Sequence, residues 1–265
     1  MKVLLTGGSG FVGINIAEAI LEAGGDAVVY SRRPMPEQAA GELSGLPGKL
    51  DWVRGDVLDR EKLLEVLRGE RIDAVVHAAA ITPDVHRESE QMSQIVRVNI
   101  LGTLNMLEAA REAGVGRFVY ISSVAVYGDA SQNHDPVYEW VEKNPHNTYE
   151  ISKFATENLV GRYRELHGMN ICALRLGDVF GAWEYQTGAR DTLSAPYQCL
   201  KAALRGESVV LAKEACTGWV YAKDCGLAVV AALESNALKH FAYNCGSIYR
   251  WSIRQWCELL KRHYP

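Results

Sequence analysis

The sequence predicts an α/β fold in which a doubly wound parallel sheet is followed by a small C-terminal lobe. Short runs rich in aliphatic and β-branched residues alternate with segments of helical period through the first two thirds of the 265-residue chain. Most of these runs are apolar on both faces, which is typical of parallel strands that helices cover on both sides. A glycine-rich turn directly after the first run supports the same arrangement.

The predicted elements follow the chain in order. Strands are expected at 2–6, 26–31, 50–53, 72–77, 117–122 and 170–176, and clear helices at 11–23, 59–68, 88–113 and 148–167. Beyond Leu176 we expect a helix at about 195–205, short strands near Val209 and Trp219, a helix at 224–234 and a strand at 241–244. Ser252 is expected to cap a last helix that runs to Pro265. We divide the chain into a main domain, 1–176, and a smaller, interleaved lobe, 177–265.

Composition argues against several classes of protein. Lys and Arg number 28 and Asp and Glu 32, so the formal net charge is −4 and no positive excess exists for nucleic-acid binding. The longest nearly uninterrupted apolar stretch, 74–81, falls short of the ~18 residues that a membrane span needs. The residues at the start of the sequence lack the charged, apolar and cleavage-site pattern of a signal peptide. We therefore expect a cytoplasmic protein that binds neither nucleic acid nor membrane.

Six cysteines lie in the second half of the chain. They form no CxxC pair, and no histidine stands at the spacing of a zinc site. We expect reduced thiols, several of them buried, and no metal site.

The segment from Thr6 to Gly13 joins the first strand to the first helix. A backbone that turns sharply and lets a pyrophosphate approach its amides has no room for side chains, and a helix N-terminus supplies partial positive charge. Gly7, Gly10 and Gly13 fit these roles, although a strand-to-helix turn can need glycine for positive φ alone. The context favours a Rossmann-type dinucleotide-binding turn.

The residues at the end of the second strand indicate which cofactor is preferred. In this kind of fold a carboxylate at that position hydrogen-bonds with the adenosine ribose of NAD. Here Ser31 is followed by Arg32 and Arg33, and guanidinium groups suit the 2′-phosphate of NADP. NADP is therefore expected in preference to NAD, and the alternative is a solvated arginine pair on a loop. Asp56, after the third strand, is a candidate to bind adenine, or it closes a turn.

Tyr149 and Lys153 lie one helical turn apart on one face of a predicted helix. A free tyrosine has a pKa of ~10, so a phenolate near neutrality needs about three units, or roughly 4 kcal/mol, of help from positive charge. Lys153 and an oxidised nicotinamide ring can supply it. Tyr197 and Lys201 repeat the spacing, but away from the expected sheet edge, and we interpret them as a helix pair without catalytic meaning.

Ser122 and Ser123 end the fifth predicted strand, at the edge where ligands of parallel sheets bind. A hydroxyl there can hold the substrate oxygen while Tyr149 moves its proton. The alternative is that both serines only satisfy backbone amides at the end of the strand.

Ordered along the chain, these motifs are similar to those of the extended short-chain dehydrogenase/reductases, the family of nucleotide-sugar epimerases and dehydratases. The resemblance rests on 6–13, 55–56, 77–80, Asn99 with 102–103, 122–128, Tyr149 with Lys153, and 175–181, and continues weakly through 219–224 and 243–247.

The resemblance implies roles for further residues. Ser123, four residues before Tyr127, is then the catalytic serine, and Asn99 supports a proton-relay water near Lys153. Cofactor contacts are implied for Phe11, Val12, Val57, Ala78, Ala79, Ala80 and Leu176, beside the residues already named, and substrate contacts for Thr82, Val124 and Asp178. The helices that begin near Glu88 and Thr148 are expected to pack against a second copy in a homodimer.

Departures from the family pattern shape the expected function. Dehydratases carry an acidic pair after the catalytic hydroxyl, where this chain has Val124 and Ala125, so dehydration is not expected. Members that bind a nucleotide diphosphate usually carry asparagine at Asp178 and arginine where this chain has Thr217 and Gly218, and both changes disfavour a diphosphate. Arg190 could reach the cleft and bind a phosphate or a substrate carboxylate, or it could face solvent.

We therefore expect an NAD(P)-dependent oxidoreductase or epimerase that moves hydride at a secondary alcohol or ketone of a small, sugar-like substrate. One rival is a sugar-nucleotide 4-epimerase that keeps and recycles its cofactor. A rival of another class is an NADP-sensing binding protein without turnover, which the joint presence of Ser123, Tyr149 and Lys153 disfavours.

Overall fold

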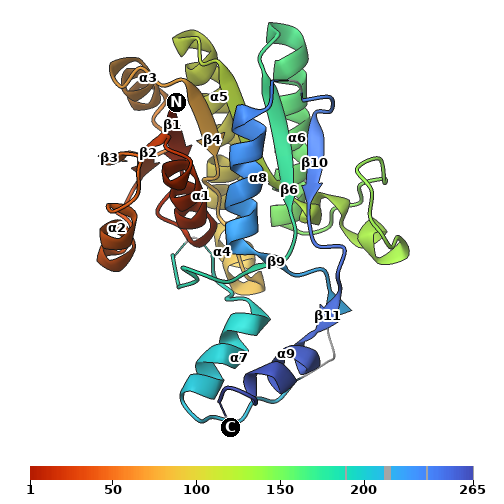
Figure 1. Cartoon of the computed structure of the whole chain (residues 1–265). Helices are drawn as coiled ribbons and strands as arrows, with labels where there is room; N and C mark the ends of the chain where they lie inside the picture. The colour runs from red at the N-terminus through yellow and green to blue at the C-terminus, as the bar shows by residue number, and fades with distance from the viewer. Residues whose placement is uncertain (189, 212–215, 237, 265) are drawn as a thin grey trace.

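A seven-stranded parallel sheet forms the centre of the protein in the computed structural model, which describes residues 1–188, 190–211, 216–236 and 238–264 (Figure 1). In spatial order its strands are β10 (Ala242–Cys245), β6 (Ile171–Leu176), β5 (Arg117–Ser123), β4 (Ala74–His77), β1 (Lys2–Thr6), β2 (Asp26–Ser31) and β3 (Leu50–Arg54). The strand order reverses at β1, because β2 lies on one side of it and β4 on the other. Such a reversal opens a crevice beyond the carboxyl ends of the strands.

Helices cover both faces of this sheet. One face carries α1 (Phe11–Glu22), α2 (Glu37–Leu43) and α8 (Ala222–Glu234); the other carries α3 (Arg60–Gly69), α5 (Gly102–Ala113) and α6 (Thr148–His167). Figure 1 shows α1 and α8 side by side. In β1, Val3 and Leu5 pack on the first face and Leu4 on the second, and all three are fully buried. This alternation with burial on both sides explains the apolar runs of the sequence.

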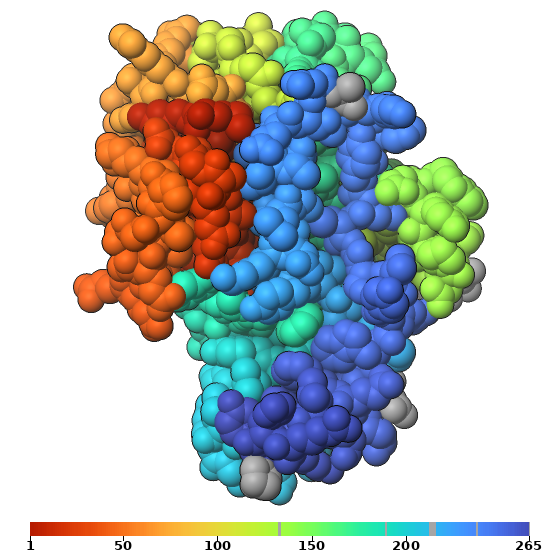
Figure 2. All heavy atoms as spheres, viewed as in Figure 1, coloured from red at the N-terminus to blue at the C-terminus, as the bar shows by residue number. Residues whose placement is uncertain are grey.

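A small lobe projects below the carboxyl ends of the strands, as Figure 2 shows for its cyan and dark blue parts. It contains the pairs β7 (Val179–Phe180) with β9 (Val220–Tyr221) and β8 (Cys216–Thr217) with β11 (Trp251–Ser252), and the helices α7 (Ala195–Leu204) and α9 (Ile253–Leu260). Phe180, Trp219, Trp251 and Trp256 form an aromatic cluster with ring centroids 5.4–6.4 Å apart. Aromatic packing thus supplies much of the core of the lobe.

The remaining elements are short or irregular. They are α4 (Val85–Val96), a π-helical turn η1 (Arg97–Leu101), and two 3₁₀ turns, η2 (Val124–Tyr127) and η3 (Asp129–Asn133). η2 and η3 follow β5 directly, so the chain stays irregular from there to the start of α6.

The six strands expected in the first two thirds are confirmed, with bounds that differ by at most two residues. The helix expected at 148–167 is also confirmed, with Asn147 forming a capping box with Glu150. The strand near residue 241 is β10, and it joins the main sheet beside β6 rather than the lobe.

The single helix expected at 88–113 is wrong. The structure has α4, η1 and α5 in its place, and α4 begins earlier because Asp84 accepts a hydrogen bond from the amide of Arg87 (2.8 Å). The π-helical turn lets Asn99 reach the backbone of Ile81, and Gly102 then lies so close to Val57 that a Cβ would be 2.6 Å from its Cγ2. These long-range contacts override the helical period.

Three smaller expectations also need correction. Residues 207–211 form no strand, so the strand near Val209 is wrong. The last helix has the expected cap at Ser252 but ends at Leu260, where the amide of Arg262 donates to the carbonyl of Leu259 in a tighter turn. The helix α2, in the Pro- and Gly-rich excursion between β2 and β3, was not expected at all.

The cysteines carry free thiols, and Cys172, Cys199 and Cys225 are buried. Across the described residues, every helix is too short or too polar to span a bilayer.

Candidate active site

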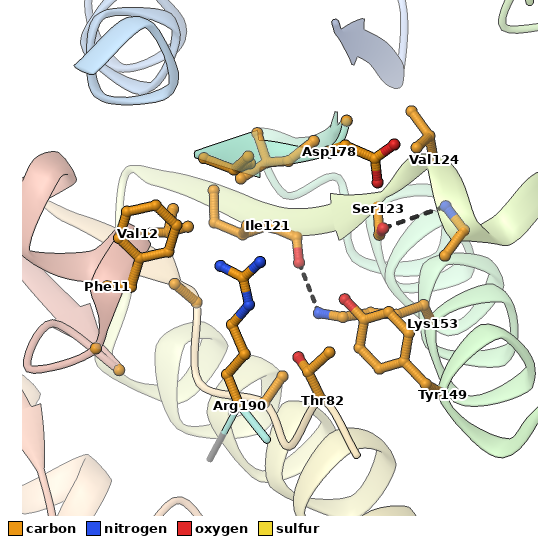
Figure 3. A pocket seen from close by; sticks show the side chains of 18 of the residues that line it. Phe11, Val12, Thr82, Ile121, Ser123, Val124, Tyr149, Lys153, Asp178 and Arg190 are labelled. Carbon is orange, nitrogen blue, oxygen red and sulfur yellow. Dashed lines mark hydrogen bonds between the residues drawn. The ribbon is translucent and has the colours of Figure 1, made fainter. Parts of the chain in front are cut away.

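One cavity of about 1660 Å³ lies beyond the carboxyl ends of the strands, between the sheet and the small lobe. It brings together every site residue expected from the sequence except Asn99. Those residues are Gly7, Gly10, Phe11, Val12, Gly13, Ser31, Arg32, Asp56, Val57, Ala78, Ala79, Ala80, Thr82, Ser123, Val124, Tyr149, Lys153, Leu176, Asp178 and Arg190. Figure 3 shows part of the lining of this cavity, with Phe11 of the first turn of α1 on one side and Tyr149 on the other.

The glycine turn fits a cofactor pyrophosphate. Gly7 has φ 71°, and a Cβ on it would lie 2.8 Å from the amide nitrogen of Ala79. A Cβ on Gly13 would lie 2.1 Å from the carbonyl oxygen of Gly7, so neither position tolerates a side chain. The start of α1 is thereby held against the end of β1, with its N-terminal amides at the cavity wall.

At the adenosine end, Ser31 and Asp56 are already engaged with protein atoms. The Ser31 hydroxyl donates to the carbonyl of Arg33 (2.7 Å) and accepts from the indole of Trp52 (3.1 Å). One Asp56 oxygen accepts from the amide of Leu58 (3.0 Å), as in the turn considered for this residue. Arg32 and Arg33 are exposed and line the cavity, so guanidinium groups supply the positive charge at this end.

The structure separates the two serines at the end of β5. Ser122 is buried and donates to the carboxylate of Glu157 (2.7 Å). Ser123 lines the cavity, and its hydroxyl accepts from the amide of Ala125 (3.1 Å); Figure 3 shows it at the same end of the cavity as Tyr149. Ser123 is therefore the serine that can meet a substrate oxygen.

Burial raises the pKa of Tyr149, while the hydroxyl groups of Ser123 and Thr82 and the charge of Arg190 oppose that rise. The phenol is thus protonated at neutral pH in the free protein. Further positive charge has to enter the cavity before Tyr149 can act as a base.

Lys153 is almost fully buried and donates to the carbonyl of Ile121 (2.8 Å). Burial lowers the pKa of its ammonium group to about 8, against an opposing contribution from Glu157. Figure 3 shows Lys153 beside Tyr149, with the ammonium on the cavity side of the phenol ring.

Asn99 has well-defined partners outside the cavity lining. Its side chain accepts from the amide of Ile81 (2.8 Å) and donates to the carbonyl of Ile81 and the hydroxyl of Ser152 (both 3.0 Å). Asn99 therefore ties the loop after β4 to α6 next to Lys153, and a role with a relay water stays a prediction.

On the substrate side, a carboxylate and a hydroxyl stand where the family pattern has other groups. Thr217 donates to Asp178 (3.0 Å), and both residues line the cavity with Val124. Thr82 forms a backbone bridge with Arg190, whose side chain extends into the cavity. The second tyrosine–lysine pair lies on α7, where the Lys201 ammonium is 5.7 Å from the centre of the Tyr197 ring.

Several residues of the site carry no signal in the local sequence pattern. Arg250 lines the cavity mouth and forms an ion pair with Asp135. Tyr185 also lines the cavity and donates to the carbonyl of Ser9 in the glycine turn. Both residues lie in loops whose sequences show no hydrophobic periodicity, and only the folding of the chain brings them to the cavity.

The protein has a doubly wound sheet with a tight glycine turn at the point where the strand order reverses, and Ser123, Tyr149 and Lys153 line the same cavity. Together these features define a class of enzymes that use a nucleotide cofactor. A family model described as "NAD dependent epimerase/dehydratase family" matches residues 3–246. The chain therefore belongs to the NAD-dependent epimerase/dehydratase family.

Relatives and solved structures agree with this assignment. A UDP-glucose 4-epimerase of Streptomyces lividans is 33% identical over 68% of this chain and 53% of its own length. A putative UDP-glucose 4-epimerase of Methanocaldococcus jannaschii is 27% identical over 98% of this chain and 81% of its own. The chain thus spans about half of one relative and four fifths of the other.

The crystal structure of a UDP-glucose 4-epimerase from Thermus thermophilus, solved in complex with NAD, has a TM-score of 0.83. It is 27% identical and matches 99% of this chain and 83% of that one.

The buried ammonium of Lys153 predicts a pH-dependent stability. Its pKa is about 8 in the folded protein and ~10.4 in the unfolded chain, so between these values the unfolded state binds more protons. The native protein should gain up to about 3 kcal/mol of unfolding free energy over Lys153→Met as the pH rises from 8 to 10 and beyond. Urea denaturation of both proteins at several pH values measures this, and parallel curves would contradict the buried-ammonium assignment.

Proposed function

We propose that this protein is an NAD(P)-dependent enzyme that transfers hydride at a secondary alcohol or ketone of a sugar-like substrate, with Tyr149 as the general acid/base. The observation that carries the proposal is that Ser123, Tyr149 and Lys153 line the same cavity as the glycine turn. Residues 1–176 contain the cofactor-binding and catalytic residues, and residues 177–265 form the lobe that faces the substrate.

The residues have distinct tasks. The glycine turn and Arg32 would hold the dinucleotide, and the nicotinamide, when bound, supplies the hydride-accepting or hydride-donating carbon. Ser123 holds the substrate oxygen, and Tyr149 takes the proton from the substrate hydroxyl or returns it in the reverse direction. The Lys153 ammonium, fixed by the carbonyl of Ile121, lowers the cost of charge on the Tyr149 oxygen. Asn99 keeps this part of α6 in place through Ser152.

A second candidate is a sugar-nucleotide 4-epimerase that retains its cofactor and returns the hydride to the opposite face. The names of the matched relatives favour it, since both are UDP-glucose 4-epimerases, one of them putative. Asp178 and Thr217 oppose it, because a carboxylate faces the cavity where the family pattern places neutral and cationic partners of a diphosphate. Release of reduced cofactor during turnover separates the two functions.

We propose the cytoplasm as the location, and the free thiols support this.

Replacing the proposed acid/base residue should slow the catalytic reaction strongly without weakening the binding of the cofactor. Tyr149→Phe is expected to slow turnover by ~10²- to 10⁴-fold, while affinity for the dinucleotide stays nearly unchanged because the glycine turn is untouched. Tyr197→Phe is the matched control on α7 and should keep full activity. Full activity of Tyr149→Phe together with inactivity of Tyr197→Phe would show that the wrong tyrosine had been chosen.

Cofactor preference should depend on Arg32. Arg32→Ala is expected to weaken NADP by roughly 10- to 150-fold, the equivalent of ~1.5 to 3 kcal/mol, and to leave NAD almost unaffected. Arg54→Ala, exposed at the end of β3 and outside the cavity lining, is the control. Calorimetry in which the native protein binds NAD more tightly than NADP would overturn the NADP preference.

Binding and turnover of the substrate should not require that it carries a nucleotide diphosphate. Free sugars and sugar acids are expected to raise the melting temperature and to turn over with cofactor at least as well as UDP-, GDP- and dTDP-sugars, since one lost arginine contact costs ~1.5 to 3 kcal/mol. Thermal shift and cofactor absorbance measure both. Submicromolar binding of a nucleotide sugar with no response to free sugars would establish the epimerase candidate instead.

A homodimer should form through α4 and α6. The apolar side chains that these helices expose include Met92, Val96, Ile151 and Leu159, which a two-fold mate would cover. Light scattering at micromolar concentration should give twice the monomer mass, and Ile151→Glu should shift it toward the monomer. A monomer mass for the native protein would refute the dimer.

A further inference from the structure

Arg190 enters the cavity from the loop between β7 and α7. Its backbone forms a bridge with Thr82, and its amide donates to the hydroxyl of Thr187 (3.0 Å). From there the side chain crosses the cavity, and the guanidinium carbon lies 5.2 Å from the centre of the Phe11 ring. Figure 3 shows the guanidinium between Phe11 and Val12 on one side and Ile121 on the other. It therefore ends next to the first turn of α1.

Two sources of positive charge meet at this point. Phe11 and Val12 are the first two residues of α1, and the N-terminus of a helix carries partial positive charge on its amides. A guanidinium beside it adds to this positive charge, so an anion lying between them would be attracted by both. The phosphate-binding fit of the glycine turn and the position of Arg190 thus point to the same anion.

The nearby carboxylate of Glu184 leaves Arg190 with capacity for such an anion. Glu184 has a fully buried side chain, and its oxygens accept from the amide (2.5 Å) and the hydroxyl (2.6 Å) of Ser194. Its distance to a guanidinium nitrogen of Arg190 is 3.5 Å, longer than a charge-assisted hydrogen bond. A guanidinium has five donors in a planar fork that matches phosphate oxygens.

The chain around Arg190 is fixed at both ends. Toward α1, Asn15 donates to the carbonyl of Ala182 (2.8 Å). Toward α4, Arg87 donates to Asp191 (2.9 Å), and the amide of Asp191 donates to the carbonyl of Thr82 (3.2 Å). Arg190 is therefore held in place before a ligand arrives, which reduces the entropy lost on binding.

We propose that Arg190 is a further cofactor-binding residue, whose guanidinium binds the pyrophosphate of the dinucleotide beside the first turn of α1. The proposal rests on the proposed function, because it requires that the cavity binds a dinucleotide. It assigns Arg190 to the cofactor rather than to a substrate carboxylate, since the guanidinium lies at Phe11, while Ser123 and Tyr149 lie at the other end of the cavity.

The test measures binding without turnover. Affinities for NADH and NADPH are determined by fluorescence titration, and affinity for ADP-ribose, which has the pyrophosphate but no nicotinamide, by calorimetry. Arg190→Ala is expected to weaken all three by roughly 10- to 150-fold and to flatten the dependence of affinity on salt. Arg190→Lys keeps the charge without the planar fork and should lie between the native protein and Arg190→Ala.

The controls keep the outcomes apart. Arg205→Ala removes an exposed arginine at the end of α7, outside the lining of the cavity, and should leave all three affinities unchanged. Unchanged affinities in folded Arg190→Ala or Arg190→Lys would overturn the proposal and return Arg190 to the substrate. Failure of the native protein to bind NADH, NADPH or ADP-ribose would instead refute the proposed function itself.

Discussion

Glu157 of α6 and Arg175 of β6 form an ion pair whose side chains are only 7% and 5% exposed. Two buried charges are costly unless their remaining donors and acceptors are satisfied, and here they are. Glu157 also accepts from Ser122, and Arg175 donates to the hydroxyl of Tyr127 (2.6 Å) and the carbonyl of Glu139 (3.1 Å). The pair therefore joins a helix, two strands and the loop before α6.

The catalytic arrangement follows from this network. Tyr149, Lys153 and Glu157 are spaced by four residues, so they lie on one side of α6 and the pair fixes the rotation of all three. Successive residues of a strand point to opposite faces, so Ser122, turned toward Glu157, leaves Ser123 for the cavity. The position of Ser123 and Tyr149 on the same cavity is thus a consequence of a buried charge pair one helical turn beyond Lys153.

The features that could be predicted from the sequence are those with a local cause. The glycine turn and the Tyr149–Lys153 spacing each lie within a few residues, and strands buried on both faces show themselves by composition. The predictions that were wrong or incomplete concern features determined by contacts between residues far apart in the sequence. Asn99 interrupts a regular helical pattern because its partner, Ile81, lies 18 residues away. Strand β10 has a clear pattern of its own, but nothing in that pattern says that it pairs with β6.

Ser194 connects the small lobe to Glu184, whose carboxylate lies beside Arg190. Its hydroxyl accepts from the amide of Tyr197 and so caps α7, while both its amide and its hydroxyl donate to the buried carboxylate of Glu184. A rotation of α7 that keeps these bonds would carry Glu184 away from Arg190. A ligand bound by Arg190 would therefore be coupled to the position of α7 through Glu184 and Ser194.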